Sequence, residues 1–522
     1  MTDQAAGRSA SSRLDELAHE ILSELAVQFP VCLSSDEFHF FPQFKSDHDN
    51  GGEWEDFSDT GIQRFQARVS QWCRRLEQLR PAQPASSLGL DVDLLIRVLT
   101  TLDEQFSLVC PHKTQPTFYL TIISIGLAES IDASYDAFGR RIQTLPAFIK
   151  AAEENLVQVP AVCRDLALNM IPQLRTWLML LPMTDAEQQA IMAGLDHYQD
   201  HLTKIDPAVG FRLPHDVYAR VADFHMGTQM ELEEIAWHLD REIEAAADLL
   251  ADSAARIASG KTWQTVFHEL PAPVATHNDV AALYESGIDQ IKRHCLEQGF
   301  TDDDVIADCG VEIQTIPEHL RPIRANAAYS MPPGHPPKGG IFYILPLNRQ
   351  AVPKDLMLLA AHETFPGHHL LDTHRWRLPQ PLRRHLEFPL FYEGWASFGE
   401  EILFDTGFFS GPVDRLLMAK RRFWRAQRGR ADLRIHTGQW GLEEAALELS
   451  AAGLADYHQA LAMVQRYALK PGYQLAYAIG RGKFRQLYTA FTGHGGTPGQ
   501  FVRQVLSQGE MGFDHLAERV LY

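Results

Sequence analysis

Residues 362–369 read His362-Glu363-Thr364-Phe365-Pro366-Gly367-His368-His369, and Glu393-Gly394-Trp395-Ala396 follows on the same chain. Zinc takes imidazole nitrogens and carboxylate oxygens as ligands, in a roughly tetrahedral array with one position left for water. Glu363, directly after the first histidine, is placed to act as a base toward that water. The stretch predicts a zinc hydrolase, and a peptidase first of all.

The histidine spacing differs from that of the common zinc-protease helix, HExxH, in which two histidines lie one turn apart. Here the next histidines stand six and seven positions after His362, and Pro366-Gly367 lies between them. Proline interrupts helical hydrogen bonding. A local break must therefore carry His368 or His369 back toward the first helix, and the residues alone leave both open as ligands.

Residues 391–401 form the pattern of a second helix, on which Glu393 and Glu400 are seven apart and share a face. Either could ligate a metal while the other orients a metal-bound histidine. The alternative is a solvated acidic face, and that description fits Glu401 better than Glu393, which has aromatic neighbours.

Hydrophobic periodicity predicts a mainly α protein. Apolar residues recur at helical spacing from about residue 12 to 260, and Asp223 to Asp252 is typical of one long amphipathic helix. Residues 311–316, 327–331 and 340–345 instead have strand character and predict a small antiparallel sheet beside the active-site helix. An exposed edge of that sheet could bind an extended peptide, or the strands could only pack on the helices.

A chain of 522 residues is too long for one ordinary core, so we expect two or three domains or lobes. Residues 1–265 would be a helical N-terminal scaffold lobe, and residues 266–522 a catalytic lobe. The catalytic lobe would hold the sheet at about 310–346, the metal helices at about 355–405 and then the C-terminal helices.

Composition narrows the partners and the location. Lys plus Arg number 47 against 67 Asp plus Glu, which gives a formal charge of −20 and disfavours nucleic acid. The six cysteines form no CxxC pair, residues 1–20 lack the apolar core of a signal peptide, and the apolar runs are too short to span a bilayer. These features predict a cytoplasmic protein without a membrane partner.

The HETFPGHH and EGWA motifs together resemble a large bacterial family catalogued as a domain of unknown function and grouped with the gluzincin-type zinc peptidases. The similarity extends over roughly 310–520, in Ala328-Tyr329-Ser330-Met331-Pro332-Pro333, in Asp432 with His436 and Trp440, in Arg466-Tyr467, in Pro471-Gly472 and in Tyr477-Ala478-Ile479-Gly480. The resemblance implies a multi-helix zincin-like peptidase.

The same resemblance implies a site. The family keeps the histidine directly after Pro-Gly more strictly than the next one, which implies one Zn²⁺ per chain on His362, His368 and Glu393. Glu363 would be the general base, taking a proton from the zinc-bound water and returning it to the leaving amine.

The remaining candidates surround that centre. His436 and Tyr477 are candidates for the donor that stabilises the oxyanion. Asp432, one turn before His436, could orient a ring. Arg466 could pair with a substrate carboxylate or form an internal salt bridge. The other expected neighbours are Glu400, His369 and, for the substrate strand, Tyr329. Tyr473 departs from the family, which often has Gln after Pro-Gly, and this leaves specificity open.

The sequence thus predicts a zinc-dependent hydrolase of short peptides, of carboxypeptidase, dipeptidase or oligopeptidase type. Two alternatives stay open: a metal-dependent amidase or tailoring enzyme on a peptide-like metabolite, and a catalytically inactive helical binding protein. The same nitrogen and oxygen ligands accept manganese, cobalt or iron. The oligomeric state is not predicted.

Overall fold

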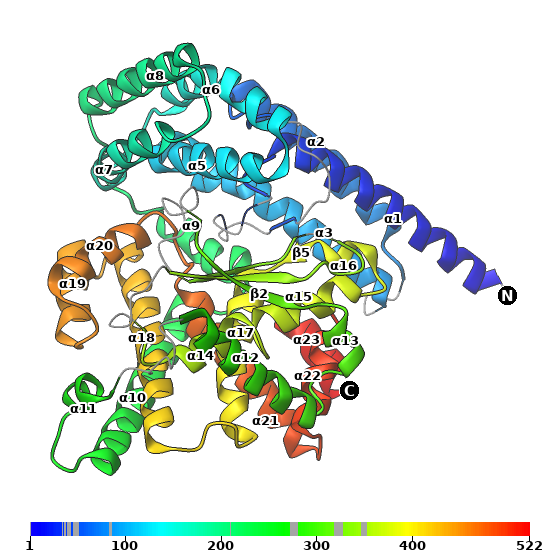
Figure 1. Cartoon of the computed structure of the whole chain (residues 1–522). Coiled ribbons are helices and arrows are strands. Elements are labelled where there is room, and N and C mark those ends of the chain that lie inside the picture. Colours follow the sequence, from blue (N-terminus) through cyan, green and yellow to red (C-terminus); the bar gives the residue numbers. More distant parts are fainter. Residues whose placement is uncertain are drawn as a thin grey trace. The chain divides into compact units, whose positions relative to one another are not determined.

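The structure is a computed structural model of the whole chain (Figure 1) and describes residues 2–33, 35, 38, 43–44, 52–82, 86–208, 210–271, 280–317, 327–332, 334–345 and 352–522. It divides into two compact units. Unit 1 comprises residues 1–213, 317–325 and 380–386, and unit 2 comprises 214–316, 326–379 and 387–522.

Unit 1 is helical. Its elements are α1 (Thr2–Gln28), the short strand β1 (Gln43–Phe44), α2 (Asp59–Leu79), α3 (Ser87–Glu104), the π-turn η2 (Gln105–Val109), α4 (Pro111–Thr114), α5 (Pro116–Ala133), α6 (Tyr135–Asn155), α7 (Ala161–Leu178), α8 (Asp185–Lys204) and α16 (Pro381–Arg384). Ser58 caps α2 by accepting a hydrogen bond from the Gly61 N–H.

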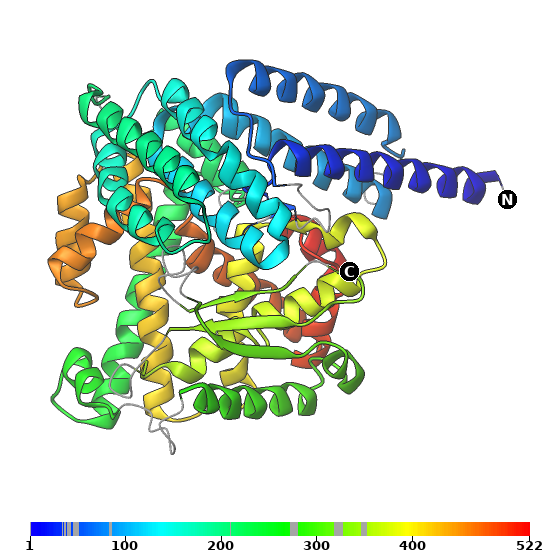
Figure 2. The same ribbon diagram turned by 45° about the horizontal axis from the view of Figure 1, so that its top comes forward.

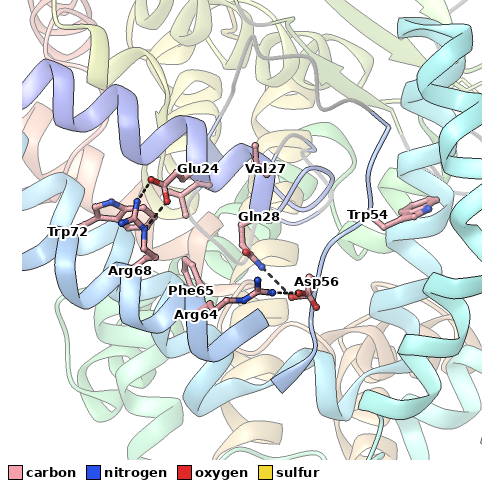
Figure 3. Close-up of a pocket in the computed structure, with 10 residues that line it drawn as sticks. Glu24, Val27, Gln28, Trp54, Asp56, Arg64, Phe65, Arg68 and Trp72 are labelled. Atoms are coloured by element: carbon pink, nitrogen blue, oxygen red, sulfur yellow. Dashed lines mark hydrogen bonds and ion pairs between the residues drawn. The ribbon is translucent and has the colours of Figure 1, made fainter. Parts of the chain in front are cut away.

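Ion pairs line a cavity of about 320 Å³ in unit 1 (Figure 3). Arg68 of α2 pairs with Glu24 of α1, and Arg64 of α2 pairs with Asp56 at 2.8 Å. The Arg68 guanidinium also lies over the Trp72 ring, 5.1 Å from its centroid. The Arg68–Glu24 pair cross-links α1 and α2.

Unit 2 holds the predicted metal motif. Its helices before the sheet are α9 (His215–Arg220), the π-turn η3 (Val221–His225), α10 (Leu232–Ile257), α11 (Trp263–Glu269), α12 (Val280–Glu297) and α13 (Asp303–Ala307). After the sheet come α14 (Leu356–Glu363), α15 (His368–Arg377), α17 (Pro389–Asp405), α18 (Pro412–His436), α19 (Leu442–Ala451), α20 (Tyr457–Tyr467), α21 (Leu475–Gly493), α22 (Pro498–Leu506) and α23 (Phe513–Leu521). The two-residue strand β5 (Leu386–Glu387) precedes α17.

Two helix pairs organise unit 2: α10 lies along α18, and α17 lies along α21 (Figure 1). The mainly α prediction is confirmed. Helix α10, which the sequence analysis assigned to the 1–265 lobe, belongs to unit 2. The predicted helix from Asp223 to Asp252 begins too early, because the left-handed backbone of Gly227 (φ 83°) and Gln229 (φ 54°) interrupts it before Leu232.

The sheet consists of β2 (Val311–Thr315), β4 (Gly340–Ile344) and β3 (Ala328–Ser330), in that spatial order, with α12 packed along β2 (Figure 2). The strands lie where the sequence predicts them, although Pro333 and residue 346 lie outside the described residues. The antiparallel prediction is wrong for one pair. β3 and β4 are antiparallel, but β4 inserts between β3 and β2 and runs parallel to β2. The sheet is therefore mixed.

Candidate metal centre

A break between two helices brings His362 and His368 together. Helix α14 ends at Glu363 and α15 begins at His368. A Cβ at Gly367 would overlap the backbone carbonyl of His362, so only glycine fits there. The Gly367 N–H donates to the Ala361 carbonyl oxygen at 3.1 Å. The start of α15 therefore folds back on the end of α14, and the His362 and His368 ring centroids lie 4.8 Å apart.

Helix α17 brings the third residue, Glu393. The Trp395 Nε1–H of this helix donates to the Pro366 carbonyl oxygen at 2.8 Å, which fixes α17 against the break. The Glu393 Oε2 atom lies 3.5 Å from His362 Nε2 and 3.7 Å from His368 Nε2. The His368 ring also stacks on Tyr392, with centroids 4.0 Å apart, and this contact fixes its plane.

These three side chains fit a divalent cation. Their ligand atoms all lie within 4.8 Å of one another. Ligands held about 2.1 Å from a tetrahedral metal are roughly 3.4 Å apart, close to the two distances from Glu393. His362, His368 and Glu393 are 6%, 5% and 7% exposed, so all three side chains are buried. Two nitrogens and one oxygen suit zinc as well as other transition metals.

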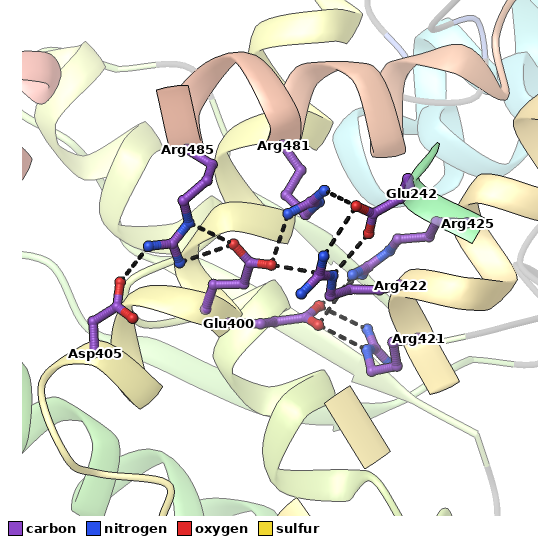
Figure 4. A network of polar contacts seen from close by, with 9 residues as sticks. Glu242, Glu400, Asp405, Arg421, Arg422, Arg425, Arg481 and Arg485 are labelled. Carbon is purple, nitrogen blue, oxygen red and sulfur yellow. Dashed lines mark hydrogen bonds and ion pairs between the residues drawn. The ribbon is translucent and has the colours of Figure 1, made fainter. Parts of the chain in front are cut away.

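Glu400 lies behind the first histidine. Its Oε1 atom is 3.1 Å from His362 Nδ1, which also lies 3.1 Å from Arg425 Nη2; in the tautomer with the proton on Nδ1, that proton is donated to Glu400 and the Nε2 lone pair faces the cluster. Arg421 and Arg425 both donate to Glu400 from α18 (Figure 4). Arg421 also donates to Asp355. The contact between Glu400 Oε1 and His362 Nδ1 is the one that a role of Glu400 in orienting a metal-bound histidine requires.

Buried charges shift the pKa values around the cluster. Burial acts to raise the pKa of Glu400, but Arg421 and Arg425 hold that pKa well below its usual range. Burial acts to lower the pKa of His362, and the hydrogen bonds to Glu393 and Glu400 outweigh it, so that pKa is raised. Burial raises the pKa of Glu363 to about 7. Glu400 is therefore an anion held by two arginines.

His369 faces away from the cluster. Its Nε2 lies 3.1 Å from the Cys309 carbonyl oxygen and its Nδ1 lies 3.0 Å from the Tyr329 hydroxyl. A carbonyl only accepts, so Nε2 carries the proton and the Tyr329 hydroxyl donates to Nδ1. Burial lowers the pKa of His369 to about 4, in keeping with this neutral state. Tyr329, considered for the substrate strand, is buried with it in this contact.

Two tyrosines lie on the other side of Glu393. The Tyr473 hydroxyl donates to Glu393 Oε1 at 2.9 Å, and the Tyr477 hydroxyl donates to that of Tyr473 at 3.3 Å. Tyr477 was a candidate from the sequence. Sequence reasoning does not identify Tyr473 as a site residue, and its departure from the family at the position after Pro-Gly is the one signal that points to it.

Asp432 holds the turn that carries Tyr473. Its carboxylate accepts the Gly472 and Gln474 N–H groups, each at 3.0 Å, and the Tyr218 hydroxyl at 3.2 Å. Asp432 was expected to orient a ring. The contacts that the structure gives it with this turn add a second role, which is to place Tyr473.

The last two candidates lie in different surroundings. His436 is buried, stacks on Tyr218 with centroids 5.0 Å apart, and has its Nε2 3.3 Å from the Tyr467 carbonyl oxygen. Arg466 is exposed on α20 and makes no ion pair within the described part of the chain. The role of His436 as oxyanion donor and the role of Arg466 as partner of a substrate carboxylate stay predictions.

A family model described as "Bacterial protein of unknown function (DUF885)" matches residues 44–520, and the chain belongs to this family. Two solved structures share the fold at 16% identity. One, from Shewanella oneidensis, has a TM-score of 0.74 with 98% of this chain and 100% of that chain covered. The other, from Colwellia psychrerythraea, has a TM-score of 0.76 with 98% of each covered. The search of curated proteins finds no match.

These neighbours correct one prediction. Both are described as a "putative lipoprotein", so the cytoplasmic location that we expected is wrong by this comparison and is withdrawn. No helix among the described residues is both long and apolar enough to cross a membrane.

Proposed function

We propose that this member of the DUF885 family is a metal-dependent hydrolase that cleaves peptide bonds in short peptides. The observation that carries the proposal is the convergence of His362, His368 and Glu393 on one point, beside Glu363 in sequence. When bound there, a divalent cation such as zinc would polarise a carbonyl and make water more acidic.

The protein's own residues supply the rest. Glu400 fixes the His362 ring through Nδ1, and Tyr392 fixes the His368 ring by stacking. Glu363 would accept a proton from the attacking water and pass it to the departing amide nitrogen. The C–N bond breaks, a C–O bond forms, and the products are a carboxylate and an amine. Because Tyr477 lies next to Tyr473 at Glu393, it is our first candidate for the donor to the oxygen that becomes negative.

Metal analysis and peptide hydrolysis together test the proposal. Protein loaded with zinc, manganese, cobalt or iron should retain about one ion per chain. Glu363→Gln should keep the metal and lose hydrolysis of a short-peptide library by roughly 10²-fold or more. The exposed Glu443→Gln in α19 is the matched control and should behave as wild type. Absence of metal retention, or equal hydrolysis by wild type and Glu363→Gln, would overturn the proposal.

A further inference from the structure

Arg428 of α18 lies beside the tyrosines of the metal centre. Its Cζ atom is 4.8 Å from the Tyr477 ring centroid and 5.8 Å from those of Tyr467 and Trp424. The Tyr477 and Tyr473 hydroxyls continue from there to Glu393. The Tyr477 side chain therefore links the Arg428 guanidinium to the Tyr473 hydroxyl, which donates to Glu393.

The acceptor that this guanidinium contacts directly is an amide oxygen. Its Nε and one terminal nitrogen both donate to a single neutral acceptor, Gln474 Oε1. Within the part of the chain that the structure describes, Arg428 forms no ion pair. Asp432, one turn further along α18, accepts instead from the backbone of the turn at 472–474.

The other buried and half-buried arginines of α18 show the contrast. Arg421 and Arg425 pair with Glu400, and Arg422 pairs with Glu242 (Figure 4). Further along the helix, Arg430 and Arg434 lie 3.5 and 3.6 Å from Asp240. The Arg428 charge bears the desolvation cost of burial with only through-space attraction to carboxylates such as Glu393, and a directly bound anionic ligand would offset that cost. The planar fork of arginine matches a carboxylate in particular.

We propose that Arg428 binds the free C-terminal carboxylate of the peptide substrate, so that the hydrolase acts at or near the C-terminus. The inference rests on the proposed peptidase function. A protein with a net charge of −20 repels anions over its surface, so a substrate carboxylate needs such a local cation. The short path from Arg428 to Glu393 favours substrates with few residues after the cleaved bond. Arg466, which the sequence suggested for this role, is exposed.

The test compares each peptide with its C-terminal amide. Wild type should prefer the free acid in kcat/KM by roughly 10²-fold or more, because the amide leaves the guanidinium without its anion. Arg428→Gln should lose most of this preference, because its KM should rise more for the acid than for the amide. Arg434→Gln, on the same helix but paired with Asp240, is the matched control and should keep the preference.

A second readout does not need turnover. Glu363→Gln protein should bind the free-acid peptide more tightly than its amide in calorimetric titration, and adding Arg428→Gln should remove the difference. If wild type hydrolyses and binds the acid and the amide equally well, the role of Arg428 is overturned and the peptidase proposal stands. If wild type hydrolyses neither the acid nor the amide, both the peptidase proposal and this inference are overturned. If Arg428→Gln does not fold, the acid-to-amide ratio of kcat/KM is compared between Arg428→Lys and wild type, and that comparison tests the role of Arg428.

Discussion

At the scale of single residues, two adjacent histidines have different environments. His368 and His369 are neighbours on α15, where successive side chains point in different directions around the helix. His368 faces Glu393, whereas His369 is held by Cys309 and Tyr329. The residues alone left both open as ligands, because the direction of each ring depends on how α15 follows the break at Gly367.

Alanine substitutions should separate these two histidines. His368→Ala removes a proposed ligand, so we expect zinc content after loading to fall close to zero. His369→Ala should keep the metal but lower the free energy of unfolding by about 1–3 kcal/mol, because the Cys309 carbonyl and the Tyr329 hydroxyl lose their partner. Metal analysis and urea unfolding measure the two effects. Loss of metal in His369→Ala, with retention in His368→Ala, would reverse the assignment.

Motif spacing and helical periodicity are local, so the sequence could point to His362, Glu393 and Glu400, whereas the choice of His368 over His369 came from the family resemblance. The sequence could not point to Arg425, which contacts His362 across 63 residues, or to the contact of Tyr473 with Glu393 across 80. No pattern along the chain connects residues so far apart. Their contacts follow from the packing of α18 and α21 against the metal helices.

At the scale of elements, a backbone contact between α17 and α21 positions the site. A Cβ at Gly394 would meet the Gly480 backbone at 2.6 Å, and a Cβ at Gly480 would overlap the Leu390 carbonyl. Glu393 precedes the first glycine, and Tyr477 lies one turn before the second. The glycines of the EGWA motif and of Tyr477-Ala478-Ile479-Gly480 thus let the two helices approach closely enough to bring these side chains together.

Two glycines of α21 provide a matched pair of variants. Gly480→Ala should force α17 and α21 apart, lower the free energy of unfolding by about 1–3 kcal/mol and reduce metal affinity through Glu393. A Cβ at Gly482 meets nothing within 4 Å, so Gly482→Ala should be neutral or stabilise by up to about 1 kcal/mol through helix propensity. Chemical unfolding and metal titration measure both. Equal stability of the two variants would contradict the close contact.

The elements themselves were partly predictable. Strand positions follow from alternation, but the pairing of β2 with β4 does not, because β3 lies between them in sequence. Helix α10 starts at Leu232 and not at the predicted Asp223. The apolar periodicity continues through Gly227, but the left-handed backbone at that residue interrupts the helix.

At the scale of the whole molecule, a bound ion should stabilise the fold. An ion that binds only the folded state at about 100 times its Kd adds about 2.7 kcal/mol. We therefore expect chelation to lower the melting temperature of wild type and to leave that of His368→Ala unchanged. Differential scanning calorimetry, with and without chelator, measures this. An identical melting temperature for wild type in both conditions would contradict a metal at this site.

Unit 1 should respond to pH through His112. This ring is fully buried against Phe106 and Phe57, and burial lowers its pKa to about 4. An unfolded histidine has a pKa of about 6.5, so between these values the unfolded chain binds more protons. The stability contributed by the neutral ring is present above pH 6.5 or so and is lost as the pH falls toward about 4.

Lowering the pH from 7 to 5 should cost roughly 2 kcal/mol through this ring. His112→Leu should lose less stability than wild type over the same interval, by about that amount. Urea unfolding of both proteins at both pH values gives the difference. Equal losses in the two proteins would show that His112 does not titrate in this way.

The attachment of the turn at 472–474 to Asp432 has a kinetic consequence. Two backbone N–H groups of the turn end on one buried carboxylate, which the Tyr218 hydroxyl also contacts, so the backbone on both sides of Tyr473 is tied to α18. A displacement of this turn would have to break both backbone bonds, so amide hydrogen exchange at Gly472 and Gln474 would be slow.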